Sequence, residues 1–521
     1  MTDGDLRRAI AKNISTKTKL ERIMNRKVFF VEKSASPSEI LTRAAAKIRA
    51  EGWHKNRLNK IVVVDQDRRV LNVVSLFDLW QASDIRFKRI GVVGLGYVGL
   101  TLSLTLADLG FEVLGSDIDP AIRRIISKAQ APFYEAGLDR LLKDHINQRF
   151  KIVLNFAGKN QCDVYFIAVG TPLNTKQRPQ LEHLEAAASA LGNVIKQGDV
   201  VILRSTVPLG TTREVVVPIL EKRSGLVAGE DFSVAFAPER TVEGKALEEL
   251  RNLPQVIGGL NRASANQASS IFNLMTDTVF IVDTPEEAEM VKLINNTYRD
   301  VTFAFANEVA LVCQKWGMDT NKVVNAANLG YPRSQIPKPS PGVGGYCLEK
   351  DPFIFIESGR SRGYEPRLAR EARIINQQIL KAVAEDTILF FRKTRNKNPV
   401  ICILGFAFKG DPPTSDMRGS PTLKLVQILR KRGLKRILGY DPQVDSKDLR
   451  VLKVEPVLDL KKVLPRADAI IVMTNHPYFK GLDMRSLLAA PRTTPLFFYD
   501  TWALYSGDEL KKVKGVVYKR L

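Results

Sequence analysis

The chain has 521 residues, of which 45% are hydrophobic and 26% are charged, a balance typical of a soluble globular protein. Its apolar runs are short and interrupted, so the sequence predicts no transmembrane helix. The polar start Met1–Asp5 lacks the apolar region of a signal peptide. We therefore expect a cytoplasmic protein that does not bind membranes and has about three or four domains.

The charge and the cysteine content limit the partners and cofactors that we expect. The formal net charge is +22, but lysine and arginine are spread along the chain without a nucleic-acid-binding motif. We therefore expect a solvated basic surface and no nucleic-acid partner. Four cysteines do not make a disulfide scaffold, and no Cys/His cluster has zinc spacing, so no metal is expected. Cys162, Cys313 and Cys402 lie in apolar segments, whereas Cys347 lies in a glycine-rich loop.

Residues 1–88 are predicted to form a small α+β module. After a linker we expect a helix at 36–52, strands at 60–65 and 69–75, and a short helix that opens at Ser75. The endings Thr2–Asp5 and Ser75–Asp78 resemble the closing signature of cystathionine-β-synthase-type (CBS) repeats, which pair and often bind adenine nucleotides. Only the end of the first repeat is present, so either the chain starts further upstream or this repeat is truncated. A bound adenine nucleotide and a role in dimerisation or packing are alternatives here.

The next module opens with a dinucleotide-binding pattern. A strand from Arg89 runs into Gly94–Gly99, a Gly-x-Gly-x-x-Gly sequence, and then into a helix at 98–109. The glycines permit a tight turn and a close approach to a pyrophosphate, which a helix N-terminus favours. Asp117 follows the second strand, roughly 20 residues on, where a carboxylate accepts the ribose hydroxyls. Because this carboxylate repels a 2′-phosphate, we expect NAD in preference to NADP.

Three further strands, at 163–169, 199–203 and 232–237, continue the alternation of strands and helices. Each ends in polar residues, among them Thr206 and Glu239. Ligands of an open α/β sheet lie at the carboxyl ends of its strands, so these residues are candidates for a site. Ordinary capping or turn chemistry is the alternative for both.

A long helix is predicted at 286–316, because apolar residues recur there at helical spacing. Lys292 and Asn296 are four residues apart and therefore share one face. A helix of this length bridges domains or forms a subunit contact. An ordinary solvated lysine is the alternative for Lys292.

The loop Pro339–Pro352 follows, in which glycines and prolines surround Cys347. A thiol is nucleophilic as thiolate, which nearby positive charge favours, and Lys350 and Asp351 are close in sequence. An incidental cysteine in a surface loop is the alternative.

A last module from Val400 has a second nucleotide-type βαβ pattern without the glycine fingerprint. It could hold the nucleotide of a substrate opposite NAD.

Taken together, these motifs resemble the nucleotide-sugar dehydrogenases, the UDP-glucose and UDP-N-acetylhexosamine 6-dehydrogenase family, over roughly residues 88–510. The motifs are Gly94–Gly99, Pro132–Leu138, Val169–Pro172, Ser205–Pro208, Pro238–Arg240, Glu289–Asn296, Gly342–Pro352, Phe406–Lys409 and Asp416–Pro421. The resemblance implies an α/β protein in which two Rossmann-like domains are joined by a long central helix, preceded by the CBS-like module. The expected domains are 1–88, 89–285 for NAD, 286–395 for the central helices and the cysteine loop, and 396–521 for the UDP-sugar.

The resemblance also implies an activity. The family oxidises the C6 alcohol of a UDP-sugar to a carboxylate with two NAD⁺, through a thiohemiacetal and a thioester on the cysteine, here Cys347. Lys292 and Asn296 would stabilise the oxyanion, while Asp351 and Glu239, supported by Thr206, would position or activate water. The implied cofactor-binding residues are Gly94, Gly96, Tyr97, Val98, Gly99, Asp117, Thr171, Thr206 and Arg418. The implied substrate-binding residues are Glu239, Arg240, Lys292, Asn296, Arg333, Gly344 and Lys409, with Arg333 reaching across the interface of a homodimer formed about the long helix.

The substrate is less clearly indicated. Pro238–Arg240 and Gly244–Leu247 resemble the branch acting on UDP-N-acetylmannosamine or UDP-N-acetylglucosamine, which we favour. Lys350 resembles the UDP-glucose branch, the alternative, and Tyr346 replaces the histidine of the N-acetylhexosamine branch. Trp502 stands where many relatives have arginine.

Two other classes of protein remain as alternatives. A two-electron β-hydroxyacid dehydrogenase shares the fold plan and a lysine on a helix, but it needs neither the thiol of Cys347 nor a second nucleotide domain. A nucleotide-sensing protein without activity is the other alternative. The presence of Cys347, Lys292 and Asp351 argues against lost activity.

Overall fold

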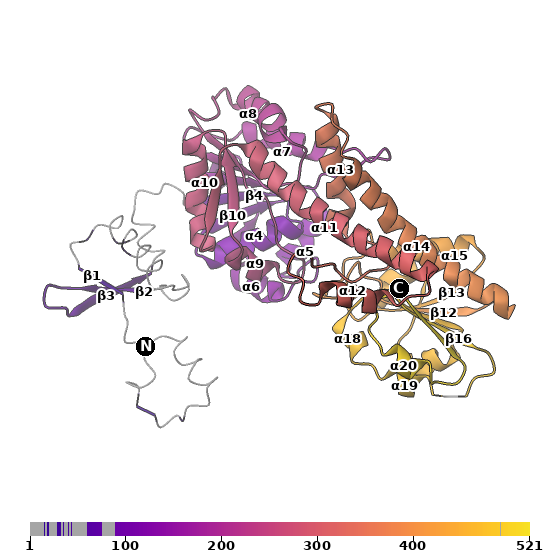
Figure 1. Cartoon of the computed structure of the whole chain (residues 1–521). Helices are drawn as coiled ribbons and strands as arrows, with labels where there is room; N and C mark the ends of the chain where they lie inside the picture. Colours follow the sequence, from indigo (N-terminus) through magenta and orange to yellow (C-terminus); the bar gives the residue numbers. More distant parts are fainter. Residues whose placement is uncertain are drawn as a thin grey trace. The chain divides into compact units, whose positions relative to one another are not determined.

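The structure is a computed structural model that describes residues 15, 18–19, 29–32, 35, 40, 43, 60–75, 89–489 and 491–521. The chain divides into two compact units, Met1–Lys88 and Arg89–Leu521 (Figure 1). Both CBS-type endings, apart from Ser75, lie outside the described residues, as do most of the predicted helix at 36–52 and the helix predicted to open at Ser75.

The first unit contains a small sheet in the order β1-β2-β3. The predicted strands are present as β2 (Lys60–Val64) and β3 (Val70–Ser75), which pair in antiparallel fashion. The strand β1 (Phe30–Glu32) pairs in parallel with β2 and lies in the segment that we expected to be a linker. Three residues are too few to give a recognisable alternation, which explains why the sequence did not reveal this strand.

An eight-stranded sheet begins the second unit, in the order β11-β10-β9-β8-β7-β4-β5-β6. Its strands are β4 (Arg89–Val93), β5 (Glu112–Ser116), β6 (Phe150–Ile152), β7 (Val164–Ile167), β8 (Val200–Leu203), β9 (Ser233–Phe236), β10 (Gln255–Gly259) and β11 (Val279–Val282). Among these described strands, only β9 and β10 pair in antiparallel fashion. The central strands are buried on both faces, as parallel strands covered by helices on each side must be.

Helices cover this sheet, and the order of strands reverses between β4 and β7. The covering helices are α4 (Tyr97–Asp108), α5 (Pro120–Ser127), α6 (Leu138–His145), α7 (Glu182–Gly192), α8 (Val217–Ser224), α9 (Ala246–Asn252) and α10 (Arg262–Met275). Such a reversal leaves a crevice at the carboxyl ends of the strands, where open α/β sheets bind ligands.

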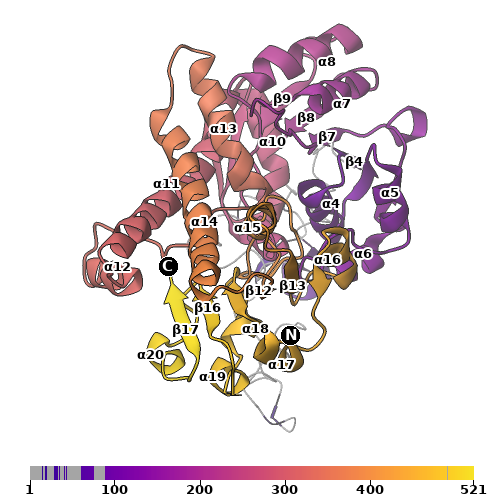
Figure 2. The same cartoon turned by 90° about the vertical axis from the view of Figure 1, so that its right-hand side faces the viewer.

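The long helix is confirmed as α11 (Pro285–Lys315). A capping box fixes its start, since Thr284 accepts a hydrogen bond from the backbone of Glu287 and the Glu287 carboxylate accepts one in return. It contacts α12 (Thr320–Asn328), α13 (Tyr346–Arg360) and α14 (Arg367–Thr394). Figures 1 and 2 show α11 running from the first large sheet towards the second, with α14 alongside.

The second large sheet is entirely parallel in its described strands, in the order β14-β13-β12-β15-β16-β17. Its strands are β12 (Val400–Leu404), β13 (Arg436–Tyr440), β14 (Glu455–Pro456), β15 (Ala469–Val472), β16 (Leu496–Asp500) and β17 (Val516–Arg520). Its helices are α15 (Pro421–Lys431), α16 (Ser446–Val451), α17 (Leu460–Val463), α18 (Pro477–Lys480), α19 (Met484–Leu487) and α20 (Gly507–Leu510). The predicted α/β class with two Rossmann-like sheets is confirmed for residues 89–521. None of the described helices has the length and apolar character needed to cross a bilayer.

Candidate active site

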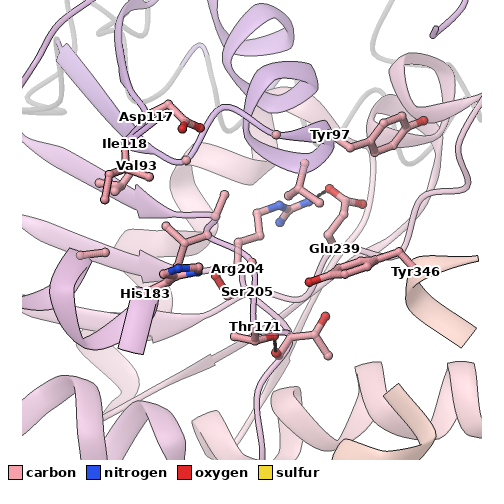
Figure 3. Close-up of a pocket in the computed structure, with 18 of the residues that line it drawn as sticks. Val93, Tyr97, Asp117, Ile118, Thr171, His183, Arg204, Ser205, Glu239 and Tyr346 are labelled. Carbon is pink, nitrogen blue, oxygen red and sulfur yellow. Dashed lines mark hydrogen bonds and ion pairs between the residues drawn. The ribbon is translucent and has the colours of Figure 1, made fainter. Parts of the chain in front are cut away.

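A cavity of about 720 Å³ opens at the strand reversal of the first large sheet. Its walls come from the loops that follow β4, β5, β7, β8 and β9, from Lys292 of α11, from the start of α13, and from Arg418 of the C-terminal module. Figure 3 shows Asp117 at one side, Arg204 with Glu239 in the middle and Tyr346 at the other side. The cavity therefore joins the fingerprint loop to the cysteine loop.

The fingerprint loop has the geometry that a pyrophosphate requires. Gly94 has a φ of 90°, and a Cβ on Gly99 would lie 1.8 Å from the carbonyl oxygen of Gly94, so both positions need glycine. Gly96 has no neighbouring heavy atom within 4 Å of a Cβ position, and it begins α4 without a side-chain cap. The helix N-terminus thus presents free space and backbone N–H groups to an anion.

Asp117 holds this loop in place from the end of β5. Its Oδ2 accepts a hydrogen bond of 2.7 Å from the N–H of Leu95, and its Oδ1 accepts one of 2.8 Å from the N–H of Asp119. The guanidinium of Arg123, which also lines the cavity, donates to the carbonyl oxygen of Asp117. The carboxylate faces the space where the ribose of a dinucleotide would lie, so these residues fit NAD.

Cys347 is the second residue of α13, two positions after Gly345, whose φ is 91°. Its side chain is exposed to the cavity, whereas the other three cysteines are buried. The Lys350 ammonium donates to Thr171 Oγ1 over 3.1 Å and lies 3.1 Å from the Asp351 carboxylate. The thiol is thus tied through its own turn to the loop after β7.

Asn296 of α11 completes this arrangement, since its amide donates to Asp351 Oδ2 over 2.6 Å. Although Cys347 opens into the cavity, desolvation of its thiol by the surrounding protein raises its pKa, and the negative charge of Asp351 raises it further, while Lys292 and Lys350 act in the opposite direction. The net shift is upward, so the neutral thiol is the favoured form. The two lysines thus favour the thiolate, as we expected from the sequence, but burial and Asp351 outweigh them.

Glu239 is buried, and both of its carboxylate oxygens are occupied. Oε2 lies 2.6 Å from the guanidinium of Arg204, and Oε1 accepts hydrogen bonds of 2.7 and 2.8 Å from the N–H groups of Arg240 and Thr241. Burial alone would raise the pKa of Glu239, but the charge of Arg204, with these hydrogen bonds, holds it below its usual range. The ammonium group of Lys292 donates a hydrogen bond to the backbone carbonyl oxygen of Glu239.

The structure brings most of the predicted residues to the cavity. Those that line it are Gly94, Gly96, Tyr97, Val98, Asp117, Thr171, Thr206, Glu239, Lys292, Cys347 and Arg418. In the described part of the chain, the lining does not include Gly99, Arg240, Asn296, Arg333, Gly344, Asp351 or Lys409. Asn296 and Asp351 lie behind it, whereas the exposed Arg333 lies over the ring of Tyr331, 4.5 Å from its centre. Across the described residues, no group of His, Cys, Asp or Glu could hold a metal ion.

Comparison with protein families gives three consecutive matches. Residues 88–276 match the NAD binding domain of the UDP-glucose/GDP-mannose dehydrogenase family, 286–378 its central domain, and 402–507 its UDP binding domain. The chain belongs to the UDP-glucose/GDP-mannose dehydrogenase family. It is an NAD-dependent nucleotide-sugar dehydrogenase, as the resemblance implied.

The chain aligns with nearly the whole length of the proteins that it resembles. The chain is 36% identical over 407 residues to UDP-N-acetyl-D-mannosamine dehydrogenase of Pyrococcus horikoshii, spanning 77% of this chain and 92% of that protein. It is 34% identical over 409 residues to an NDP-N-acetyl-D-galactosaminuronic acid dehydrogenase of Ralstonia solanacearum, spanning 77% and 94%. The solved P. horikoshii enzyme superposes with a TM-score of 0.73 at 33% identity, covering 83% of this chain and 98% of that one. A UDP-glucose dehydrogenase of Pyrobaculum islandicum superposes with a TM-score of 0.70 at 28% identity, covering 84% and 98%.

In this dehydrogenase the loop at 241–245, directly before α9, contacts the C-terminal module beside the cavity. Lys409 donates to the carbonyl oxygen of Glu243, and Thr414 donates to the Glu243 carboxylate over 3.4 Å. Burial raises the pKa of Glu243 to about 7 and lowers that of Lys409 to about 8. Glu135 anchors the same loop by accepting the N–H groups of Gly244 and Ala246.

Sequence reasoning missed several residues of the dehydrogenase site. Arg204 and Glu243 line the cavity, and the cations of Lys350 and Arg418 lie over the ring of Tyr346, 5.4 and 4.9 Å from its centre. One signal was available for Arg204, namely a charged residue directly after the fully buried strand β8. The sequence held no such signal for Glu243.

Proposed function

We propose that the chain oxidises the C6 alcohol of UDP-N-acetylmannosamine or UDP-N-acetylglucosamine to a carboxylate with two NAD⁺. The observation that carries this proposal is Cys347, which opens into the same cavity as the NAD fingerprint and faces the UDP binding module. A two-electron dehydrogenase has no use for a thiol at this place. The N-acetylhexosamine is favoured by the mannosamine dehydrogenases among the relatives. UDP-glucose is the alternative, because a UDP-glucose dehydrogenase has the same fold.

Different residues of this chain would bind the cofactor, attack the aldehyde and stabilise the oxyanion. Gly94, Gly96 and Asp117 would hold NAD, which supplies the hydride acceptor when bound. The thiol of Cys347 would release its proton to water as its sulfur adds to the carbonyl carbon of the aldehyde, which stays attached as a thiohemiacetal. Loss of a second hydride and of the hydroxyl proton would convert this to a thioester, and water would then release the acid and regenerate the thiol. Lys292, fixed against the carbonyl oxygen of Glu239, would donate to the oxygen that becomes negative as the C–S bond forms.

Asn296 would act through the hydrogen bond that it donates to Asp351. This hydrogen bond orients the buried carboxylate, which in turn holds the Lys350 ammonium 3.1 Å away beside the thiol. Thr206, which lines the cavity, would position the hydrolytic water. Glu239, which we expected to activate water, has both oxygens occupied and a lowered pKa. Its proposed part is therefore to shape the peptide that holds Lys292, rather than to accept a proton.

A panel of UDP-sugars with NAD⁺ tests this proposal by counting NADH for each sugar consumed. Two NADH with an N-acetylhexosamine and only background turnover with UDP-glucose supports it. The reverse preference assigns the UDP-glucose branch. One NADH per sugar, with release of the aldehyde, would refute the four-electron course, and no NADH with any sugar would refute the activity.

We also propose that two copies pair along α11. The exposed apolar side chains of this helix follow one stripe, at steps of four and seven residues. They are Ile294, Tyr298, Phe305, Val312 and Trp316, between 44% and 77% exposed. A second copy would cover them. Tyr298→Glu combined with Phe305→Glu should convert a dimer to a monomer in light scattering, whereas Leu458→Glu, an exposed leucine elsewhere, should not; a wild-type monomer would refute the pairing.

For the N-terminal unit we propose a CBS-like module that packs or dimerises, with an adenine nucleotide as its candidate ligand. The three-stranded sheet β1-β2-β3 supports an α+β module there. Equilibrium dialysis of the full chain with AMP and ATP tests the ligand. Binding that NAD⁺ does not displace supports it, and no retention of either nucleotide refutes it.

A further inference from the structure

A proline interrupts the helix that carries the cysteine. Pro352 lies inside α13, six positions after its first residue Tyr346. An ordinary residue at 352 would donate its N–H to the carbonyl oxygen of Leu348, but proline has no N–H. That carbonyl oxygen belongs to the residue directly after Cys347. The turn that carries the thiol thus lacks one of its own helical hydrogen bonds.

Arg373 of α14 supplies a substitute. Its Nη1 donates to the carbonyl oxygen of Leu348 over 3.2 Å. The same nitrogen lies 2.7 Å from Asp300 Oδ1, and both side chains are buried. Asn376 holds Asp300 from a second side, donating over 2.9 Å to the same carboxylate oxygen. The guanidinium therefore cannot swing away without leaving a buried carboxylate unpaired.

Asp300 also connects this contact to the rest of the candidate site. It lies on α11 four and eight residues after Asn296 and Lys292, so the three share one face of the helix. On the other side, Glu349 lies 3.8 Å from Arg373 and pairs with Lys424 of α15. One guanidinium thus links the turn of the thiol to the helix that presents the lysine.

We propose that Arg373 is a positioning residue that replaces the N–H missing at Pro352 and fixes the Cys347 turn against α11. The proposal rests on the proposed role of Cys347. A hydrogen bond from a charged donor is stronger than the backbone bond it replaces, which suits a turn that must hold its side chain still. A shift of the thiol by a fraction of an ångström would misalign it with the aldehyde.

The test uses the double variant Asp300→Asn with Arg373→Gln in the full chain, which removes both charges together and leaves neither buried alone. We expect kcat to fall about 10-fold or more while KM for NAD⁺ stays unchanged. Adding Pro352→Ala restores an N–H to the helix and should recover most of the lost kcat. The control is Arg370→Gln on the same helix, whose side chain is 57% exposed and which should keep wild-type kcat.

Alkylation of Cys347 by iodoacetamide gives a readout that needs no sugar, because the other cysteines are buried. Lys292 and Lys350 lower the pKa of this thiol, while burial, Asp351 and Glu243 raise it. A loosened turn exposes the thiol to water. Because burial and Asp351 outweigh the two lysines in the intact turn, the midpoint of the pH profile should then move to lower pH. Pro352→Ala should reverse the shift.

Two results would overturn the proposal. One is a double variant with wild-type kcat and a wild-type alkylation profile. The other is a loss that Pro352→Ala does not restore, which is what a general stabilising role of Arg373 predicts. If the double variant does not fold, Arg373→Lys serves instead, because it keeps a charge beside Asp300 while its shorter side chain withdraws the donor from the carbonyl oxygen of Leu348. A wild-type protein that oxidises no UDP-sugar would refute the proposed function, and the alkylation profile would still test the positioning.

Discussion

Replacing Asp117 should change the choice between NAD and NADP, and the structure allows the size of the effect to be worked out. The carboxylate has two tasks: its charge faces the ribose region of the cavity, and its Oδ2 accepts the N–H of Leu95 over 2.7 Å. Asp117→Asn removes the charge and keeps an oxygen for Leu95. Asp117→Ala removes both. Comparison of the two variants therefore separates repulsion of a 2′-phosphate from support of the fingerprint loop.

Two unit charges about 4 Å apart interact by roughly 1 kcal/mol in water and roughly 4 kcal/mol near a protein surface. Since the cavity is open to solvent, we take about 1.4 to 2.8 kcal/mol, which corresponds to a 10- to 100-fold loss of preference for NAD⁺. Arg123, which lines the cavity beside Asp117, should then attract the phosphate. The assay is kcat/KM with each cofactor, followed by absorbance of the reduced nicotinamide. An unchanged ratio in Asp117→Asn would show that another group reads the ribose.

Two further predictions concern the thiol and the loop between the domains. Cys347→Ser should abolish acid formation without changing NAD⁺ affinity in a fluorescence titration, because a hydroxyl is a far weaker nucleophile; an equal loss of affinity would contradict a purely chemical role. Burial raises the folded-state pKa of Glu243 from 4.5 to about 7, so folding retains a proton that the unfolded chain has released in this window, and stability declines as pH rises through it. Glu243→Gln should therefore lessen the fall in Tm between about pH 5 and about pH 8, and an identical fall in both proteins would contradict this reasoning.

Much of the fold is visible in the sequence because its signals are local. The strand, the Gly94–Gly99 turn and the helix lie within about twenty residues. The helix α11 could be predicted because its apolar residues recur at helical spacing along its length. The strands β10 and β11, at one end of the first large sheet, escaped prediction. Gln255–Gly259 ends in two glycines, which have no side chain to show an alternation, and the antiparallel pairing of β9 with β10 breaks the pattern of its neighbours.

The site is less visible, because its contacts join residues far apart in the chain. Arg204 pairs with Glu239, 35 positions later, and Lys409 reaches Glu243 across 166 positions. No spacing rule connects such pairs; only the folded sheet brings the carboxyl ends of its strands to one edge. The fingerprint and Cys347 were found from sequence since each depends on its immediate neighbours. The partners that hold them were not.

The protonation state of Cys347 also depends on contacts that the sequence does not reveal. Sequence places Lys350 three residues after the thiol, which favours a thiolate if that lysine is free. The structure pairs its ammonium with Asp351 at 3.1 Å and with Thr171, so Asp351 opposes the lysine, and desolvation of the thiol is the largest influence on its pKa. A neutral thiol is also the less oxidisable form. The exposed cysteine can therefore face solvent in the cavity and still be intact when a carbonyl carbon arrives, which a preformed thiolate would make harder.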